Sequence, residues 1–262
     1  MRIALFDSGI GGLTVLSHAR RVLPSEDFLF FADRDHVPYG TKSVPAVRGF
    51  VREAFHFLVE QQKADTVVVA CNTATSVAVD EMRRLYAVPI IGMEPAVKKA
   101  LERDTERRVL VTATPITVNG EKLRRLISAY DTGGCIDLLA LPRLVEFAEE
   151  REFVSPRVEN YLWSALAPYD LINYSAIVLG CTHFNYFKDT LRQIMPQTVG
   201  FVDGNEGTVE ELARRTNLRT VPAGERKAHC TFFESGRLVE GAEALARIEG
   251  YLARAERMEE IV

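Results

Sequence analysis

Short apolar segments alternate along the chain with amphipathic segments of helical period. Within 46–62, for example, apolar side chains recur at three- and four-residue spacing with charges between them, as in a helix that covers a sheet. Strand followed by helix, repeated about eight times, predicts a parallel α/β architecture. The expected strands lie at 2–7, 27–33, 66–71, 88–93, 108–114, 135–141, 176–181 and 198–203.

The same pattern repeats at a longer period. The sequence VVVACNT at 67–73 resembles IVLGCTH at 177–183, and each places a cysteine at the end of an apolar strand. Any two parallel strands look alike at this level, but the thiol at the same place favours a true repeat. The chain therefore predicts two similar α/β halves, joined by a passage at 92–108, with the segment after residue 208 returning to the first half.

Composition and charge exclude several classes of protein. The chain has 262 residues, 47% of them hydrophobic, which is enough for a proper core, and its net charge of -4 offers no basic footprint for nucleic acid. No window approaches the roughly 18 consecutive apolar residues of a membrane span, and the N-terminus reaches Asp7 too soon for a signal peptide. The four cysteines form no C-x-x-C pair. We therefore expect a cytoplasmic protein with free thiols, no membrane segment, no bound metal and no nucleic-acid partner.

Polar side chains follow several of the expected strands, at the edge where ligands bind in parallel sheets. Cys71 precedes an expected helix, whose N-terminal N–H groups should favour its thiolate form. Cys181 has the same placement, and His183 lies two residues further on, able to hold or pass a proton. A single buried cysteine is more often packing than chemistry, but two matching sites point to function. By contrast, Cys135 and Cys230 lie outside any motif and are interpreted as structural.

A glycine-rich turn, DSGIGG at 7–12, follows the first expected strand. It lacks the spacing of a dinucleotide-binding fingerprint, and no P-loop lysine follows it, so a nucleotide is not indicated. Two interpretations remain open. Either Ser8 caps a tight turn, or Ser8 and the backbone amides bind a carboxylate while Asp7 acts as an acid or base.

Further hydrogen-bond donors lie in two loops. The segment RDHVPYGTKS at 34–43 is fixed by Pro38 and Gly40 and presents Tyr39 and the Gly40 amide, either as a plain connection or as a substrate contact. Two hydroxyl side chains follow the first strand of the second half, where they can cap a helix or bind a ligand: Thr114 and Thr117.

Taken in order, several segments resemble the glutamate racemases of the aspartate/glutamate racemase superfamily: FDSGIGGLTV, HVPYGTKS, ACNTAT, GMEP, ATPIT, LGCTH and VDGNEGT. The resemblance runs from residue 3 to about residue 208. It implies two pseudo-symmetric parallel-sheet α/β domains with the active site in the cleft between them. The first domain would comprise 1–95 plus 208–262, and the second 96–207.

The resemblance also implies cofactor-independent interconversion of L- and D-glutamate, supplying D-glutamate for peptidoglycan, by a protein that is commonly a homodimer. Racemisation needs an acid or base on each face of Cα, because a proton leaves one side and another arrives on the opposite side. Cysteine suits both roles, since its ordinary pKa of about 8.5 lies near the working pH. By this resemblance Cys71 and Cys181 take opposite faces, with Asp7 near the first thiol and His183 near the second. The positions that correspond to residues holding the amino acid are Ser8, Pro38, Tyr39, Gly40, Asn72, Thr73, Thr114, Thr117 and Thr182.

The sequence departs from the family pattern at several positions. Ala113 replaces a glycine, and Asn185 replaces a proline after the second thiol motif. A further acid of the family matches Glu149, seven residues after Pro142, with Glu146 as the reserve choice. Spacing alone would make Glu149 a solvated helix carboxylate.

Three other interpretations remain open. A sibling racemase would act on aspartate or another acidic amino acid, because a thiol pair does not select side-chain length. A cysteine hydrolase or transferase would use Cys181 with His183 alone. A binding protein would keep the pocket without turnover. A pyridoxal-phosphate enzyme is not indicated, because neither a Schiff-base lysine nor a phosphate cup is evident, and we expect no cofactor.

Overall fold

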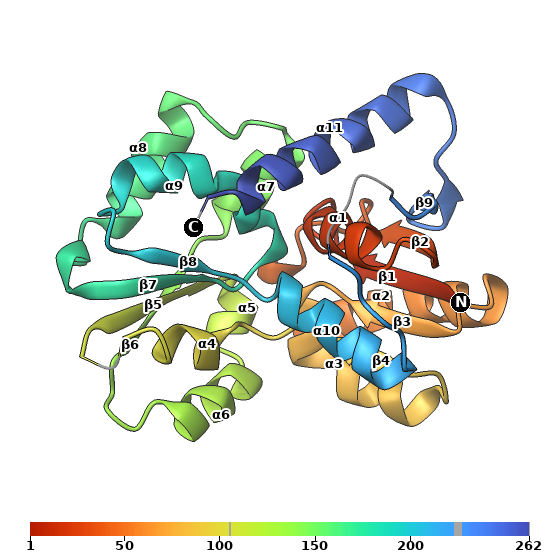
Figure 1. Cartoon of the computed structure of the whole chain (residues 1–262), viewed down its shortest axis with the longest axis horizontal. Helices are drawn as coiled ribbons and strands as arrows, with labels where there is room; N and C mark the ends of the chain where they lie inside the picture. Colours follow the sequence, from red (N-terminus) through yellow and green to blue (C-terminus); the bar gives the residue numbers. More distant parts are fainter. Residues whose placement is uncertain (105, 223–226, 262) are drawn as a thin grey trace.

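The computed structural model describes residues 1–104, 106–222 and 227–261, which form two β-sheets flanked by helices (Figure 1). One sheet has six strands in the order β10-β9-β2-β1-β3-β4, and the other has four in the order β6-β5-β7-β8. Among the strand pairs of these residues, only β9 with β10 is antiparallel. The predicted α/β fold class is therefore confirmed. The strands are β1 (Arg2–Asp7), β2 (Asp27–Ala32), β3 (Thr66–Val69), β4 (Ile90–Gly92), β5 (Arg108–Ala113), β6 (Ile136–Ala140), β7 (Tyr174–Leu179), β8 (Gly200–Val202), β9 (Cys230–Glu234) and β10 (Arg237–Leu238).

All eight predicted strands are present, as β1 to β8. β3 illustrates why the apolar runs predict them: each of its valines, Val67 to Val69, is at most 1% exposed. A strand of a parallel sheet is covered by helices on both faces, so it needs apolar side chains at successive positions instead of alternating ones. Burying one such valine contributes about 1.5–3 kcal/mol relative to leaving it in water.

The two sheets repeat one strand order, which confirms the predicted pair of similar halves. The order β2-β1-β3-β4 in the first sheet corresponds to β6-β5-β7-β8 in the second. In each case the chain moves to one side of the first strand and then returns to the other side. Such a reversal leaves an opening at the carboxyl ends of the first and third strands, where α/β proteins bind ligands. Cys71 follows β3 and Cys181 follows β7, so the two thiols occupy equivalent places.

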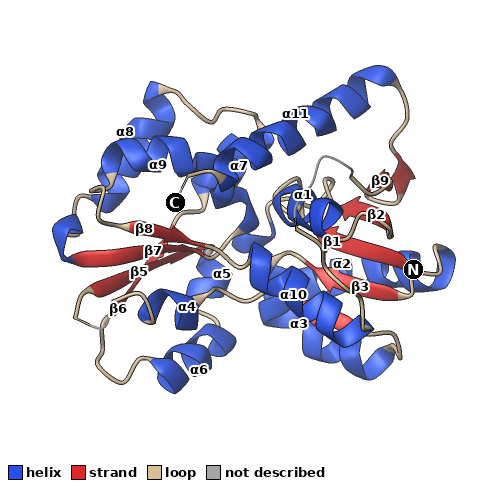
Figure 2. Cartoon of the chain, in the orientation of Figure 1, coloured by secondary structure: helices blue, strands red, loops and turns tan. Residues whose placement is uncertain are grey.

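Helices cover both sheets (Figure 2). The helix predicted over 46–62 is observed as α2, which begins after Ser43, and continues as a π-helical turn, η2. The Ser43 hydroxyl accepts a hydrogen bond from the Ala46 N–H and so caps the helix start. The helices are α1 (Leu13–Val22), η1 (Tyr39–Thr41), α2 (Val44–Phe55), η2 (His56–Gln61), α3 (Asn72–Leu85), α4 (Val97–Leu101), α5 (Pro115–Val118), α6 (Glu121–Tyr130), α7 (Arg143–Glu149), α8 (Pro156–Leu166), η3 (Leu171–Asn173), η4 (Thr182–Phe187), α9 (Lys188–Ile194), α10 (Asn205–Thr216) and α11 (Ala242–Glu259).

The C-terminal segment returns to the first sheet and also contacts the second half. β9 pairs with β2 in parallel, and β10 folds back on β9, two strands that the sequence did not predict. From there α11 runs across the molecule (Figure 1), and the Tyr251 hydroxyl donates to the Ala148 carbonyl at 3.2 Å. Arg254 likewise donates to the Tyr186 carbonyl at 2.7 Å. Residues 105, 223–226 and 262, which belong to the predicted domain segments, lie outside the described residues.

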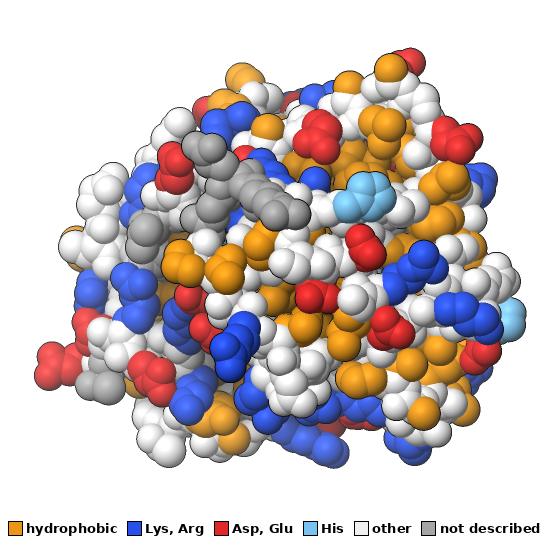
Figure 3. All heavy atoms as spheres, turned by 45° about the vertical axis from the view of Figure 1, so that its right-hand side comes forward, with side chains coloured by type: hydrophobic (Ala, Val, Ile, Leu, Met, Phe, Trp, Pro, Cys, Tyr) orange, Lys and Arg blue, Asp and Glu red, His pale blue; other side chains and the backbone are white. Residues whose placement is uncertain are grey.

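The surface carries charges of both signs. On the face drawn in Figure 3, basic and acidic side chains are interspersed with apolar ones. Within the described ranges, every helix is too short or too polar to cross a bilayer.

Candidate active site

The strands of both sheets point toward the middle of the molecule (Figure 2), so their carboxyl ends meet there. Several hydrogen bonds join the two halves at this place. The Thr182 hydroxyl donates to Asp7 Oδ2 at 2.7 Å, and the Thr73 and Thr114 hydroxyls lie 2.8 Å apart. The fold thus brings together side chains from the ends of β1, β3, β5 and β7, as the strand-end pattern predicts.

Cys71 lies at the start of α3 and is only 5% exposed. Its Sγ accepts a hydrogen bond from the Ala74 N–H at 3.4 Å and donates to Ser8 Oγ at 3.6 Å. Burial raises the pKa of Cys71, and the nearby Asp7 carboxylate raises it further, whereas the Ala74 N–H and the Ser8 hydroxyl lower it less. The expectation of a thiolate here is therefore wrong. The helix N-terminus does contact the sulfur, but desolvation outweighs it, so this environment favours the protonated thiol.

Asp7 is fully buried beside Cys71. Burial raises its pKa, although the charge of His183 and hydrogen bonds from Thr182 and Ser8 act in the opposite direction. Ser8 donates both its backbone N–H and its hydroxyl to Asp7 Oδ1, at 2.6 and 3.2 Å. Because α1 begins only at Leu13, with Gly12 as its N-cap, Ser8 does not cap it, and the capping interpretation is wrong. Ser8 instead links Cys71 to Asp7.

We expect Asp7→Asn to stabilise the protein at pH 8. The pKa of Asp7 is higher in the folded protein than its value of 3.8 in the unfolded chain. As the pH rises above 3.8, the unfolded chain therefore loses this proton more readily, and the folded state becomes less stable relative to it. The amide removes that buried charge and keeps an acceptor for the surrounding donors. Thermal unfolding should show a Tm a few degrees higher, since 1 kcal/mol shifts the Tm of a chain this size by about 2–4 °C. The difference should shrink as the pH approaches 4, and an unchanged or lower Tm at pH 8 would contradict it.

Cys181 is 7% exposed and faces a histidine–carboxylate pair. Its Sγ lies 3.8 Å from His183 Nδ1, and His183 Nε2 lies 2.8 Å from Glu149 Oε1. Burial alone lowers the pKa of His183, but its contacts with Cys181 and Glu149 raise it more, so its pKa lies above that of an ordinary imidazole. Of the two acids considered, Glu149 makes this contact, while Glu146 is exposed. His183 is thus placed to exchange a proton with Cys181 while Glu149 holds the ring.

The glycine-rich turn after β1 packs directly on this pair. The Ile10 N–H donates to Glu149 Oε1 at 2.8 Å. A Cβ at Gly9 would overlap Glu149, and one at Gly11 would overlap His183. Glycine is therefore required because the backbone of the first half approaches the second half so closely.

The remaining predicted contacts lie around the same opening. Tyr39 is fully buried, and its hydroxyl donates to Asp33, so this hydroxyl already has a partner. A Cβ at Gly40 would overlap the Thr114 side chain, which places this glycine against the second half. Pro38 is half-buried at the start of η1. Two further predicted residues are buried near Cys71 and Thr114: Asn72 and Thr117.

Sequence reasoning missed Asp33, which is 4% exposed and follows β2. It occupies the same kind of strand-end position as Asp7, so the rule applied to the other strands would have found it. A groove of about 550 Å³ opens between the halves next to Gly40, and its lining includes Lys42 and Pro115. In the described part of the chain, no three His, Cys, Asp or Glu side chains gather in a way that could hold a metal ion.

Comparison with known proteins shows which family has a similar sequence and structure. The family model for Asp/Glu/Hydantoin racemase matches residues 14–212. The glutamate racemase of Campylobacter curvus is 49% identical over 267 aligned positions, covering all of both chains. The crystal structure of the Campylobacter jejuni glutamate racemase is similar with a TM-score of 0.81 at 27% identity, covering 97% of this chain and 98% of that one.

A second solved structure shows two molecules bound to such a protein. The Escherichia coli glutamate racemase, in complex with L-glutamate and the activator UDP-MurNAc-ala, has a TM-score of 0.78 at 27% identity, covering 95% of this chain and 94% of that one. The match of the family model over most of the chain and the 49% identity of a full-length relative confirm the resemblance seen in the motifs. The chain belongs to the Asp/Glu/hydantoin racemase family.

Proposed function

We propose that this protein interconverts L- and D-glutamate, with Cys71 and Cys181 as its two acid/base groups. The observation that carries the proposal is the equivalent placement of the thiols, each after the third strand of its half. Because the carboxyl edges of the halves face each other, a substrate held between them would present opposite faces of Cα to the two sulfurs. The L-glutamate bound by the Escherichia coli relative supports glutamate as the substrate.

In one direction Cys181 takes the α-proton and Cys71 delivers a proton to the opposite face. Cys71 suits delivery because its raised pKa keeps it protonated. Cys181 must first lose its own proton, and His183, 3.8 Å away, is placed to receive it while Glu149 stabilises the imidazolium. Asp7 and Ser8 then relay a proton from solvent to the Cys71 thiolate, and His183 releases to solvent the proton it took from Cys181, so that both thiols end protonated as they began. The opposite direction exchanges the roles of the two thiols.

Polar side chains around the thiols match the charged groups of an amino acid. Asn72 Oδ1 is buried without a hydrogen-bond partner among the described residues, and it is an acceptor suited to an ammonium group. The Thr114 hydroxyl lies 2.8 Å from that of Thr73 and 3.1 Å from that of Thr117, and these donors suit a carboxylate. Donors aimed at the α-carboxylate stabilise the transition state, because negative charge moves onto that group as Cα loses its proton.

Three further proposals follow from the family resemblance. They are the supply of D-glutamate for peptidoglycan, a cytoplasmic location, and a homodimer. A sedimentation experiment on the purified chain tests the last of these directly, since the dimer should have twice the 29.3 kDa mass of the chain.

The substrate is tested by comparing L-glutamate with L-aspartate. We expect racemisation of L-glutamate, followed by circular dichroism, with kcat/KM at least about tenfold above that for L-aspartate, since one methylene group is worth about 1–3 kcal/mol in discrimination. Deuterium should also appear at Cα in heavy water, because the abstracted proton passes through groups that exchange with solvent. A preference for L-aspartate would favour the sibling racemase. Binding without any deuterium incorporation would identify a binding protein and overturn the proposal.

A further inference from the structure

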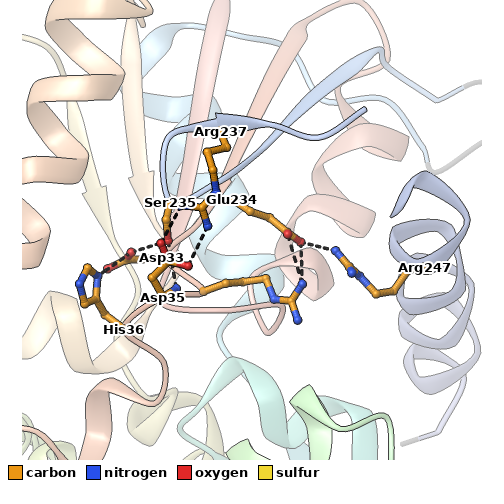
Figure 4. Close-up of polar contacts among 8 residues, drawn as sticks. Asp33, Asp35, His36, Glu234, Ser235, Arg237 and Arg247 are labelled. Atoms are coloured by element: carbon orange, nitrogen blue, oxygen red, sulfur yellow. Dashed lines mark hydrogen bonds and ion pairs between the residues drawn. The ribbon is translucent and has the colours of Figure 1, made fainter. Parts of the chain in front are cut away.

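A polar cluster outside the thiol site joins the C-terminal hairpin to the loop that follows β2 (Figure 4). Its centre is Asp33, only 4% exposed. The Asp33 carboxylate accepts hydrogen bonds from the Ser235 hydroxyl at 2.9 Å and from the Tyr39 hydroxyl at 2.5 Å. His36 Nδ1 lies 2.9 Å from both carboxylate oxygens. One carboxylate therefore fixes a turn about 200 residues away in sequence to the loop at 33–41.

Ser235 is held in a conformation that suits this contact. Its φ of 45° and the φ of 81° at Gly236 form the tight turn between β9 and β10. Its backbone N–H donates to the Ala32 carbonyl at 2.8 Å, and its hydroxyl accepts from the Asp35 N–H at 3.0 Å. The hydroxyl thus accepts one hydrogen bond from the loop and donates another to it. The contact is specific to this side chain, since no other residue of the hairpin turn reaches Asp33 among the described hydrogen bonds.

The loop fixed in this way leads to the thiol site. Tyr39 is fully buried, and burial together with the Asp33 carboxylate raises its pKa, so its hydroxyl remains a donor to Asp33. Gly40 follows directly and lies against the Thr114 side chain. Thr114 in turn contacts Thr73, two residues beyond the first thiol. The position of the Gly40 amide therefore depends on where Asp33 holds Tyr39.

We propose that Ser235 and Asp33 are positioning residues for the loop at 33–41. They hold Tyr39, and Tyr39 in turn places the Gly40 amide beside Thr114. In that position the Gly40 amide contacts the bound amino acid. The inference rests on the proposed function for its kinetic consequence. A contact that holds the amino acid equally in the ground state and the transition state changes KM and leaves kcat nearly unaltered. Neither residue touches the reacting atoms.

A matched pair of variants at one position tests this role. Ser235→Gly keeps the left-handed backbone and removes the hydroxyl, whereas Ser235→Asn also tolerates that backbone and retains a donor toward Asp33. Hydrogen bonds to charged groups are stronger than those between neutral groups, so losing this one should weaken the hold on the loop measurably. We expect Ser235→Gly to raise KM for glutamate about 5- to 10-fold with kcat within about twofold of wild type, and Ser235→Asn to restore most of the loss.

Amide hydrogen exchange provides a readout that does not depend on turnover. Segment 34–43 should exchange faster in Ser235→Gly than in Ser235→Asn, while segment 66–75 stays unchanged. Arg237→Ala is the control. Arg237 lies on the same hairpin as Ser235, but its contact with the loop is an exposed ion pair with Asp35, and such pairs contribute little. This variant should leave KM and the exchange of segment 34–43 within about twofold of wild type. If the wild type turns over no acidic amino acid, the proposed function fails, and the exchange difference alone decides the positioning role.

Two sets of results would overturn the proposal. The first is equal behaviour of the glycine and asparagine variants, in exchange or in KM. The second is a Ser235→Gly variant that loses activity in kcat alone, or one whose segment 34–43 exchanges faster without any change in KM. In either case the hydroxyl would not position a substrate contact.

Discussion

Replacing either Cys71 or Cys181 by serine should slow racemisation about 10³-fold or more in both directions, within or above the 10²–10⁴ range for the loss of an acid/base group. An alcohol is a far weaker acid than a thiol, so serine neither takes the α-proton nor delivers one at the required rate. Both directions fail together because each turnover needs both thiols. The rate is followed by circular dichroism from L-glutamate and, separately, from D-glutamate.

The other two cysteines supply matched controls. Cys135 and Cys230 are free thiols outside the site, and their serine variants should keep activity within about threefold of wild type, as expected for substitutions away from a functional feature. Full activity in Cys71→Ser would contradict the two-base account. If Cys181→Ser alone were inactive and mass spectrometry detected an acyl group on wild-type Cys181, the protein would instead be a hydrolase or transferase.

His183→Asn should lower kcat about 10²-fold with a smaller change in KM, in line with the loss of a proton-transfer partner. The imidazole lies between the Cys181 sulfur and Glu149, and no other titratable group among the described residues makes a hydrogen bond to this sulfur. Asparagine keeps a polar side chain but cannot carry the proton. The pH profile of kcat should also lose the limb that reports the His183 titration, which distinguishes proton transfer from loss of packing.

Glu149 and Glu146 form the matched pair for this prediction. Glu149→Gln keeps an acceptor for the Ile10 N–H but removes the charge that favours the imidazolium, so its effect should be smaller than that of His183→Asn, roughly tenfold. Glu146→Gln changes an exposed side chain on the same helix and should have little effect. If Glu146→Gln were the more damaging of the two, the assignment of Glu149 to the second thiol would be wrong.

The sequence predicts most of the strands because strand burial is a local property. Each of β1 to β8 is an apolar run that needs no distant information to recognise. β9 was missed because it pairs with β2, some 200 residues earlier, and only two of its five residues are buried. β10 is a two-residue strand that pairs only with β9, so it could not be predicted without β9. What predicts the pair of halves is a long-range regularity, the same thiol placed after β3 and after β7.

The sequence predicts which residues lie together at the candidate site, but it does not predict how their surroundings shift their pKa values. Strand ends bring Asp7, Cys71 and Cys181 to one edge by topology, and that can be read from the chain. The protonation of Cys71 depends on burial and on the Asp7 carboxylate, neither of which the helix start at 72 reveals. The contacts of Asp7 with Thr182 and of Ile10 with Glu149 join residues more than 100 positions apart, so only the folded chain shows them.

Hydrogen exchange at Cα in the two single-thiol variants tests the central claim most directly. Each remaining thiol should remove a proton from its own face and return deuterium to that face, so each variant should exchange one enantiomer of glutamate without inverting it. In heavy water, followed by NMR, Cys71→Ser should therefore deuterate one enantiomer and Cys181→Ser the other. Deuteration of the same enantiomer by both variants would place both thiols on one face of Cα and contradict the account.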